Sequence, residues 1–157
     1  MSLIVAATGH RPSKLKTGYD IAPLITLVKP WLASRKPDTV ISGMALGWDQ
    51  AVAIAAMDLG IPVKAYLPFI GQADQWPQAA IYEYMRLLER CDERVVVNQG
   101  GYEPWKMQAR NEAMVDAADL VLALWNGGKG GTGNCVAYAE KQRKPIENLW
   151  DIYDLDL

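Results

Sequence analysis

Residues 39–67 read TVISGMALGWDQAVAIAAMDLGIPVKAYL, two short apolar runs on either side of a longer amphipathic segment. The runs at residues 39–42 and 62–67 predict strands, whereas residues 48–59 predict a helix. Gly60 and Pro62 indicate where this helix ends, since glycine suits the position after a helix and proline cannot extend one. A strand, a helix and a strand in this order predict a βαβ unit.

The same alternation extends over the rest of the chain. Further strands are predicted at residues 3–8, 94–97, 120–124 and, as a short final strand, 145–149; further helices are predicted at residues 21–34, 77–91, 105–118 and 133–144. Pro30 lies inside the first helical segment and implies a kink or two shorter helices there. The fold class that follows is α/β, a three-layer sandwich in which helices cover both faces of a mostly parallel sheet.

The length and composition limit the function classes. A chain of 157 residues is expected to form one domain. Hydrophobic residues make up 50% and charged residues 22%, which excludes disordered, collagen-like and coiled-coil classes. The chain has a formal net charge of −2 and so lacks the excess of basic residues with which proteins bind a nucleic-acid backbone. Long nucleic acid is therefore not an expected partner.

Membrane and metal partners are not expected either. The longest early apolar run, residues 3–7, is far shorter than the ~20 residues of a membrane span, and no basic segment precedes it, so we expect a cytoplasmic protein. Cys91 and Cys135 lie far apart and His10 is the only histidine, so neither a disulfide framework nor a zinc site is expected. No cofactor is predicted.

Three polar, glycine-bearing turns follow predicted strands: residues 8–12 (TGHRP), 42–50 (SGMALGWDQ) and 126–134 (NGGKGGTGN). Ligands of an open parallel sheet lie beyond the carboxyl ends of its strands, and a helix that starts there attracts anions with its free N–H groups and its dipole. Each of the last two turns is a candidate phosphate or ribose cradle, although such turns also use glycine for geometry alone. No G-x-G-x-x-G turn follows the first strand, and no P-loop is present.

Several side chains near these turns have both a binding and a structural interpretation. Arg110, followed by Asn111, interrupts an apolar helical neighbourhood. It could clamp a phosphate, lie solvated on the surface or form an ion pair in the core. Asp49 could accept ribose hydroxyls or complement a helix dipole. His10 could act as a general acid or base, or could have a plain loop hydrogen-bonding or capping role. The aromatic residues at element ends, which could stack on a base or seal a core edge or a dimer interface, are Trp48, Trp76, Tyr102, Trp105 and Trp125.

The motifs form an ordered set from Thr8 to about Trp150: Gly9-His10-Arg11, residues 42–49 (SGMALGWD), Pro68-Phe69, Arg110-Asn111 with Met114-Val115-Asp116, and Gly130-Gly131-Thr132. This set resembles the SLOG superfamily, and most nearly its YspA/YpsA-like branch, which occurs in bacteria and their phages. The resemblance implies a Rossmann-like fold and a nucleotide ligand.

Relatives in this superfamily include the LOG enzymes, phosphoribohydrolases that cleave the N-glycosidic bond of a nucleoside monophosphate, and the DNA-binding protein DprA. The LOG pattern pairs Arg-Lys-x-x-Met with Gly-Gly-x-Gly-Thr-x-x-Glu, and its arginine and glutamate act in catalysis. Arg110 and Met114 match the first motif with Asn111 at the lysine position, but Cys135 stands where the glutamate is expected. Glycosidic cleavage needs a carboxylate, so the resemblance favours binding over hydrolysis.

We therefore predict a Rossmann-like protein that binds a nucleoside monophosphate or an ADP-ribose-like ligand as a sensor or sequestering protein. The phosphate is expected at residues 128–134, and the ribose and base towards residues 42–50 and 8–11. The alternative is a LOG-related nucleotide N-glycosidase with Arg110, Asp49 and Glu112 as catalytic residues. DNA handling is the least favoured function, and a homodimer is expected because related families commonly pair. The predicted ligand-binding residues are Thr8, Gly9, His10, Arg11, Ser42, Gly43, Gly47, Asp49, Gln50, Pro68, Arg110, Asn111, Gly128, Gly130, Gly131, Thr132 and Asn134.

Overall fold

The computed structural model describes residues 2–156 and contains one sheet of six strands. The strands are β1 (Ile4–Gly9), β2 (Thr39–Ser42), β3 (Val63–Leu67), β4 (Glu93–Val96), β5 (Leu120–Leu124) and β6 (Ile146–Asn148). They lie in the order β4-β3-β2-β1-β5-β6, and every pair is parallel. The helices are α1 (Ala22–Arg35), α2 (Trp48–Asp58), α3 (Gln78–Arg90), α4 (Pro104–Ala117), α5 (Gly131–Lys141) and α6 (Trp150–Asp156), with a short 3-10 helix η1 (Pro12–Lys14) after β1.

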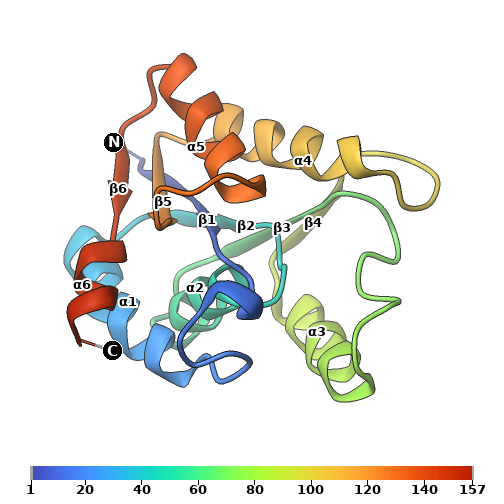
Figure 1. The fold of residues 1–157 in the computed structure, drawn as a ribbon, viewed down its shortest axis with the longest axis horizontal. Helices are drawn as coiled ribbons and strands as arrows, with labels where there is room; N and C mark the ends of the chain where they lie inside the picture. Colours follow the sequence, from blue (N-terminus) through green and yellow to red (C-terminus); the bar gives the residue numbers. More distant parts are fainter. Residues whose placement is uncertain (1, 157) are drawn as a thin grey trace.

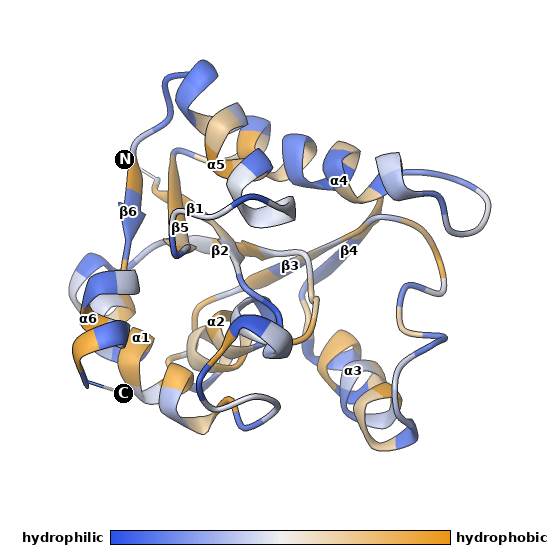
Figure 2. Ribbon diagram, in the orientation of Figure 1, coloured by the Kyte–Doolittle hydropathy of each residue, from blue (hydrophilic) through white to orange (hydrophobic). Residues whose placement is uncertain are grey.

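Helices cover both faces of the sheet (Figure 1): α1, α2 and α3 lie on one face, and α4 and α5 on the other. The central strands are apolar along their length, whereas the helices alternate apolar and polar residues, as Figure 2 shows. On the α4–α5 face, Met114 packs with Ala6 and Ile41, and Val115 packs with Val121 and Cys135. The larger core lies on the opposite face, where Trp48 is fully buried.

The predicted fold class is confirmed, and the sheet is entirely parallel. Strands β2 and β5 have the predicted bounds, and the other predicted strands differ by one residue at one or both ends. Helix α1 continues through Pro30, so two separate helices do not form there. Neither η1 nor α6 was expected. Both are short, and α6 is anchored by tertiary contacts: Tyr153 is fully buried, and its hydroxyl accepts a hydrogen bond of 2.6 Å from the N–H of Lys16.

The strand order defines where a ligand site can form. From β1 the chain adds β2, β3 and β4 on one side and then returns to place β5 on the other side of β1. This reversal opens a crevice beyond the carboxyl ends of β1 and β5, the usual ligand position in such folds. Gly9 pairs with Leu124 at this edge. None of the helices in residues 2–156 is long and apolar enough to cross a membrane.

Candidate functional site

A cavity of about 330 Å³ lies at this crevice. Its walls come from the segment that follows β1, the β2–α2 turn, the loop and first turns of α4, and the start of α5. The volume is at the lower end of the range for small-molecule sites. The lining residues are Thr8, Gly9, His10, Arg11, Ser13, Lys14, Ala45, Asp49, Tyr102, Pro104, Met107, Arg110, Asn111, Gly131 and Thr132.

Two charged side chains of opposite sign are buried in the wall of this cavity. Asp49, in the first turn of α2, is 6% exposed, and Arg110, in the middle of α4, is 3% exposed. Arg110 Nη1 donates to the main-chain oxygen of Gly43 (2.7 Å), and its Nε donates to Asn111 Oδ1 (2.8 Å). Burial raises the pKa of Asp49 to about 6, against the opposing effect of the positive charge of Arg110. Burial also lowers the pKa of Arg110 from its ordinary value.

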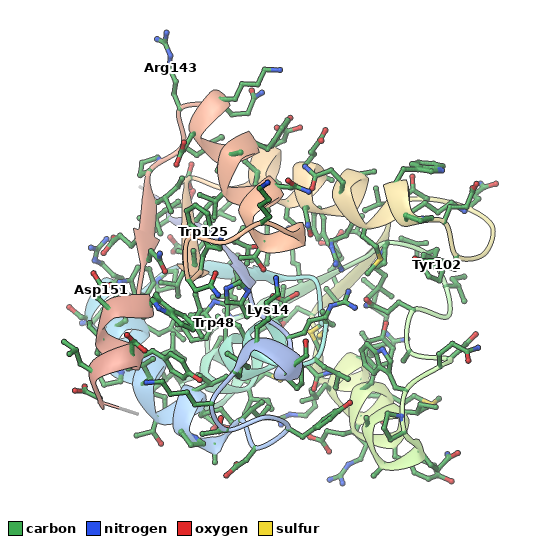
Figure 3. The ribbon with its side chains drawn as sticks, in the orientation of Figure 1. Lys14, Trp48, Tyr102, Trp125, Arg143 and Asp151 are labelled. Atoms are coloured by element: carbon green, nitrogen blue, oxygen red, sulfur yellow. The ribbon has the colours of Figure 1, made fainter. Side chains whose placement is uncertain are left out.

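The start of α5 presents free donors to the cavity. Gly130 is the N-cap of this helix, and no side chain caps it. The N–H groups of the first turn therefore have no partner within the helix, and the helix dipole adds a partial positive charge. Lys14 Nζ lies beside them, since it donates to the main-chain oxygen of Lys129 (3.1 Å). Figure 3 shows Lys14 on η1, near the centre of the molecule. An ammonium group and an uncapped helix start at one point form an anion-binding arrangement.

The loop between β5 and α5 is held in place by hydrogen bonds within the loop and to neighbouring segments. His10 Nε2 accepts a hydrogen bond from the N–H of Asn126 (3.0 Å), which requires a neutral imidazole, and burial lowers the pKa of His10. Trp125 Nε1 donates to the oxygen of Gly128 (2.8 Å). Asn148 Nδ2 donates to the oxygen of Trp125 (2.9 Å). His10 thus bonds to the β5–α5 loop while it also lines the cavity, and these hydrogen bonds position the helix start.

Glycines in the first two turns permit close packing under the cavity. A Cβ on Gly9 would lie 2.3 Å from the ring of Trp48, and a Cβ on Gly43 would lie 2.5 Å from Arg110 Nη1. Gly47, the N-cap of α2, has a φ of +96°, and a Cβ there would lie 2.5 Å from the oxygen of His10. Only glycine fits these positions. The glycines of residues 42–47 therefore allow the first two turns to pack closely beneath the cavity.

The model of the YspA SLOG family matches residues 5–155. The chain belongs to this family. A relative in Bacillus subtilis is the uncharacterized SPbeta prophage-derived protein YoqJ. It is 31% identical to this chain over 137 residues, which cover 75% of this chain and 78% of YoqJ. A UPF0398 protein of Bacillus anthracis is 22% identical, over 97% of this chain and 90% of its own length.

Solved structures share the fold of this YspA SLOG family member at low sequence identity. DNA processing protein A from Helicobacter pylori has a TM-score of 0.66 at 23% identity, and the same protein from Streptococcus pneumoniae has 0.63 at 18%. The likeness covers 93% and 94% of this chain but 64% and 50% of theirs, so the chain spans less than two thirds of the length of one and half of the other. The molybdenum cofactor carrier protein of Chlamydomonas reinhardtii has a TM-score of 0.61 at 17% identity over 94% of this chain and 76% of its own.

The predicted site residues fall into two groups. The first group lines the cavity: Thr8, Gly9, His10, Arg11, Asp49, Arg110, Asn111, Gly131 and Thr132. The second group lies outside its lining: Ser42, Gly43, Gly47, Gln50, Pro68, Glu112, Gly128, Gly130 and Asn134. Polar groups of the second set bond within the chain. Ser42 Oγ donates to the oxygen of Asp49 (2.8 Å), and Gln50 Nε2 donates to the oxygen of Met44 (3.2 Å).

Sequence reasoning missed some lining residues. Lys14 and Ser13 lie on η1, which was not predicted, although a lysine three residues after Arg11 was a visible signal. Pro104 and Met107 line the cavity without reactive groups, so the sequence gives them no marker, whereas Ala45 lies within the predicted turn of residues 42–50. Tyr102 was noted only as an aromatic residue at the end of an element; it is 68% exposed at the rim of the cavity.

The position of the LOG glutamate is occupied by a thiol that cannot replace it. Cys135 on α5 is 1% exposed, and burial raises the pKa of its thiol to about 11, so it is neutral at pH 7. Glu112 accepts a hydrogen bond from Gln108 Nε2 (3.1 Å) and does not line the cavity. Asp49 is therefore the one carboxylate among the cavity-lining residues.

Proposed function

We propose that this protein binds a nucleotide or nucleotide-derived ligand, with a phosphate at the start of α5, and that it acts as a sensor or sequestering protein. The observation that carries this proposal is the uncapped N-terminus of α5 with Lys14 Nζ beside it, inside the crevice between β1 and β5. Gly131 and Thr132 line the cavity at this point, and a glycine lets an anion approach the main chain closely.

The charges of the cavity favour an anion. Arg11, Lys14 and Arg110 supply three positive charges to the lining, against the single carboxylate of Asp49. Arg110 is buried and fixed by Gly43, so its guanidinium loses little freedom when a ligand binds. Asp49 is the candidate acceptor for a ribose hydroxyl.

Binding without hydrolysis is favoured because Cys135 stands at the position of the LOG glutamate. Stabilising an oxocarbenium-like transition state requires a nearby negative charge, which a neutral thiol does not supply. Two of the structural neighbours, from Chlamydomonas reinhardtii and Rippkaea orientalis, are described as molybdenum cofactor carrier and binding proteins, so carriage of a small molecule occurs on this fold.

One observation favours a second candidate function, a nucleotide N-glycosidase. Asp49 lines the cavity, and burial raises its pKa to about 6, in the range that suits a general acid or base near neutral pH. In that reaction water would attack C1′ of the ribose, the N-glycosidic bond would break, and a proton would pass to the leaving base. Release of free base by the wild-type protein, lost in Asp49→Asn while binding is retained, would establish it.

The experiment that tests the proposal is a thermal-shift panel of nucleoside monophosphates, NAD, ADP-ribose and cyclic nucleotides, followed by chromatography of each stabilising ligand. A ligand at ~100 times its Kd adds about 2.7 kcal/mol to the free energy of unfolding, which such a scan detects. We expect stabilisation by phosphate-bearing ligands that are recovered intact. Absence of a shift with every member of the panel at millimolar concentration would reject nucleotide binding.

A further inference from the structure

A second cavity, of about 460 Å³, adjoins the first. The two share three lining residues, Arg11, Tyr102 and Met107, which form the border between them. The remaining wall comes mainly from the irregular connection between β3 and α3, residues 68–77, and the loop before α4. A ligand that occupies the first cavity can therefore extend past this border into the second.

The two cavities differ in chemistry. The first is lined by the charged groups of Lys14, Asp49 and Arg110, which the second lacks. Phe69, Ile70 and Trp76 line the second but not the first. The second is also lined by the shared Tyr102 and by two charged residues, Arg11 and Asp74. Phe69 and Tyr102 meet edge to face with their ring centroids 6.0 Å apart. Tyr102 is 68% exposed and Ile70 is 78% exposed, so both present apolar surface that a flat ring would cover.

The wall that carries Tyr102 is fixed by a buried lysine. Lys106 is 4% exposed, and its Nζ donates to the main-chain oxygens of Gln99 (2.7 Å) and Gly101 (2.6 Å), on either side of the turn before Tyr102. Asn98 Nδ2 donates to the oxygen of Pro68 (3.0 Å) and so joins this loop to the opposite wall. Figure 3 shows Tyr102 on the loop before α4.

The opposite wall is fixed as well. Gln72 Nε2 donates to the main-chain oxygen of Gly43 (2.9 Å) and to the hydroxyl of Tyr84 (3.1 Å). Trp76 packs edge to face on Tyr84 with centroids 5.2 Å apart. Both walls are thus held by hydrogen bonds and ring contacts to the body of the fold. A preformed cavity of this kind binds a rigid ring with little cost of ordering.

At the alternative position for a base, residues 42–50, most side chains are packed inside the protein, and of these residues Ala45 and Asp49 line the first cavity. Trp48 and Ser42 are fully buried, and Gln50 is 3% exposed. The Trp48 indole N–H donates to the main-chain oxygen of Leu122 (3.3 Å), which ties the ring to the sheet. A ligand held at the start of α5 cannot place a ring there without displacing the core, whereas the second cavity is open.

We propose that the second cavity is the subsite for a planar heteroaromatic ring of the ligand whose phosphate binds at the start of α5, with Tyr102 as its stacking residue. This subsite rests on the proposed nucleotide binding and specifies the position of the base. Base stacking on an aromatic side chain depends little on which base is present, so all common bases gain from it. Its loss on substitution by alanine corresponds to about 5- to 150-fold in affinity.

The test compares ligands with and without a base on matched variants. Calorimetric titrations measure Kd for AMP, GMP, CMP and UMP and for ribose 5-phosphate, which has the same ribose and phosphate. In the wild type we expect every nucleotide to bind at least fivefold more tightly than ribose 5-phosphate. Tyr102→Ala is expected to weaken nucleotide binding at least fivefold and to change the Kd of ribose 5-phosphate by a clearly smaller factor, because Tyr102 only borders the first cavity. Tyr102→Phe keeps the ring and is expected to behave as wild type.

Tyr82→Ala is the matched control, because Tyr82 is 62% exposed on α3 and lines neither cavity. Equal affinity of the wild type for nucleotides and ribose 5-phosphate would overturn the ring subsite while leaving phosphate binding in place. Unchanged nucleotide affinity in Tyr102→Ala would overturn it too. If neither nucleotides nor ribose 5-phosphate bind, the proposed function fails and the subsite fails with it.

Discussion

The ammonium group of Lys14 donates a hydrogen bond of 3.1 Å to the main-chain oxygen of Lys129, two residues before helix α5 begins at Gly131. The contact joins η1, which follows β1, to the loop that follows β5, although the two residues are 115 positions apart in sequence. The strand order makes this possible, because β1 and β5 are neighbours in the sheet. Lys14 thereby adds a full positive charge to the partial charge of the helix start.

Lys14→Ala is expected to weaken binding of phosphate-bearing ligands by about tenfold or more, the scale of one charge-assisted hydrogen bond. It should also make the affinity less sensitive to salt, since one cation leaves the site. Titration calorimetry at two salt concentrations measures both effects. Lys129→Ala is the control, since the Lys129 side chain is exposed and only its main-chain oxygen contacts Lys14. Equal losses in the two variants would contradict a specific role for Lys14.

Asp49 is expected to make the unliganded protein less stable as the pH rises. Its pKa is raised from 3.8 to about 6 in the folded state, so the folded state binds its proton more tightly than the unfolded state does. The stabilisation is present below pH 4 and is lost as the pH rises through 6, a loss of about 3 kcal/mol at most. Urea denaturation from pH 4 to pH 7.5 measures it.

Asp49→Asn removes this titration and serves as the comparison, because other carboxylates titrate equally in both proteins. Relative to the wild type, the variant should therefore gain free energy of unfolding between pH 4 and pH 7.5. A constant difference between the two proteins over this range would mean that the carboxyl of Asp49 has its ordinary pKa.

Much of the fold follows from local sequence patterns. Residues 39–42 and 120–124 are apolar runs that match β2 and β5 residue for residue, because a strand covered on both faces needs a continuous apolar run. Helix α5 starts two residues earlier than predicted. The sequence pattern did not indicate its first turn because this turn contains Gly131 and Gly133, and glycine has low helix propensity. Helix α6 was missed because Tyr153 is stabilised by the distant Lys16, and no local pattern records such a contact.

The candidate site was predictable in outline but not in its division of roles. The turns after β1 and β5 were identified from the rule that ligands lie beyond strand ends, and the cavity lies there. The turn after β2 looked equally polar and glycine-rich, yet Ser42 and Gln50 bond within the chain. A sequence records that a residue is polar, whereas its partner depends on the packed structure.

Gly43→Ala is expected to destabilise the protein by about 2 to 4 kcal/mol, because the added Cβ would lie 2.5 Å from Arg110 Nη1 and displace a buried cation from its hydrogen bond. Urea denaturation provides the measurement. Gly101→Ala is the matched control: a Cβ there meets nothing within 4 Å, and a change within about 0.5 kcal/mol is expected. Similar losses in both variants would show that Gly43 is not packed against Arg110.

A homodimer remains a prediction, motivated by exposed aromatic residues such as Tyr82 and Trp105, which are 62% and 56% exposed. Sedimentation velocity at micromolar concentrations measures the oligomeric state directly. We expect a species of twice the mass of the 17.4 kDa chain. A single monomeric species across the concentration range would reject the dimer without affecting the binding site.

The most direct test of nucleotide binding without hydrolysis is a ³¹P nuclear magnetic resonance titration of AMP, GMP, CMP and UMP with the wild-type protein and Lys14→Ala. We expect the phosphate resonance of at least one nucleotide to shift or broaden saturably with the wild type and to change far less with Lys14→Ala. No resonance of ribose 5-phosphate is expected after prolonged incubation with the wild type. Resonances that stay unchanged at millimolar ligand with stoichiometric protein would contradict nucleotide binding. Growth of a ribose 5-phosphate resonance would contradict binding without hydrolysis and would establish nucleotide N-glycosidase activity.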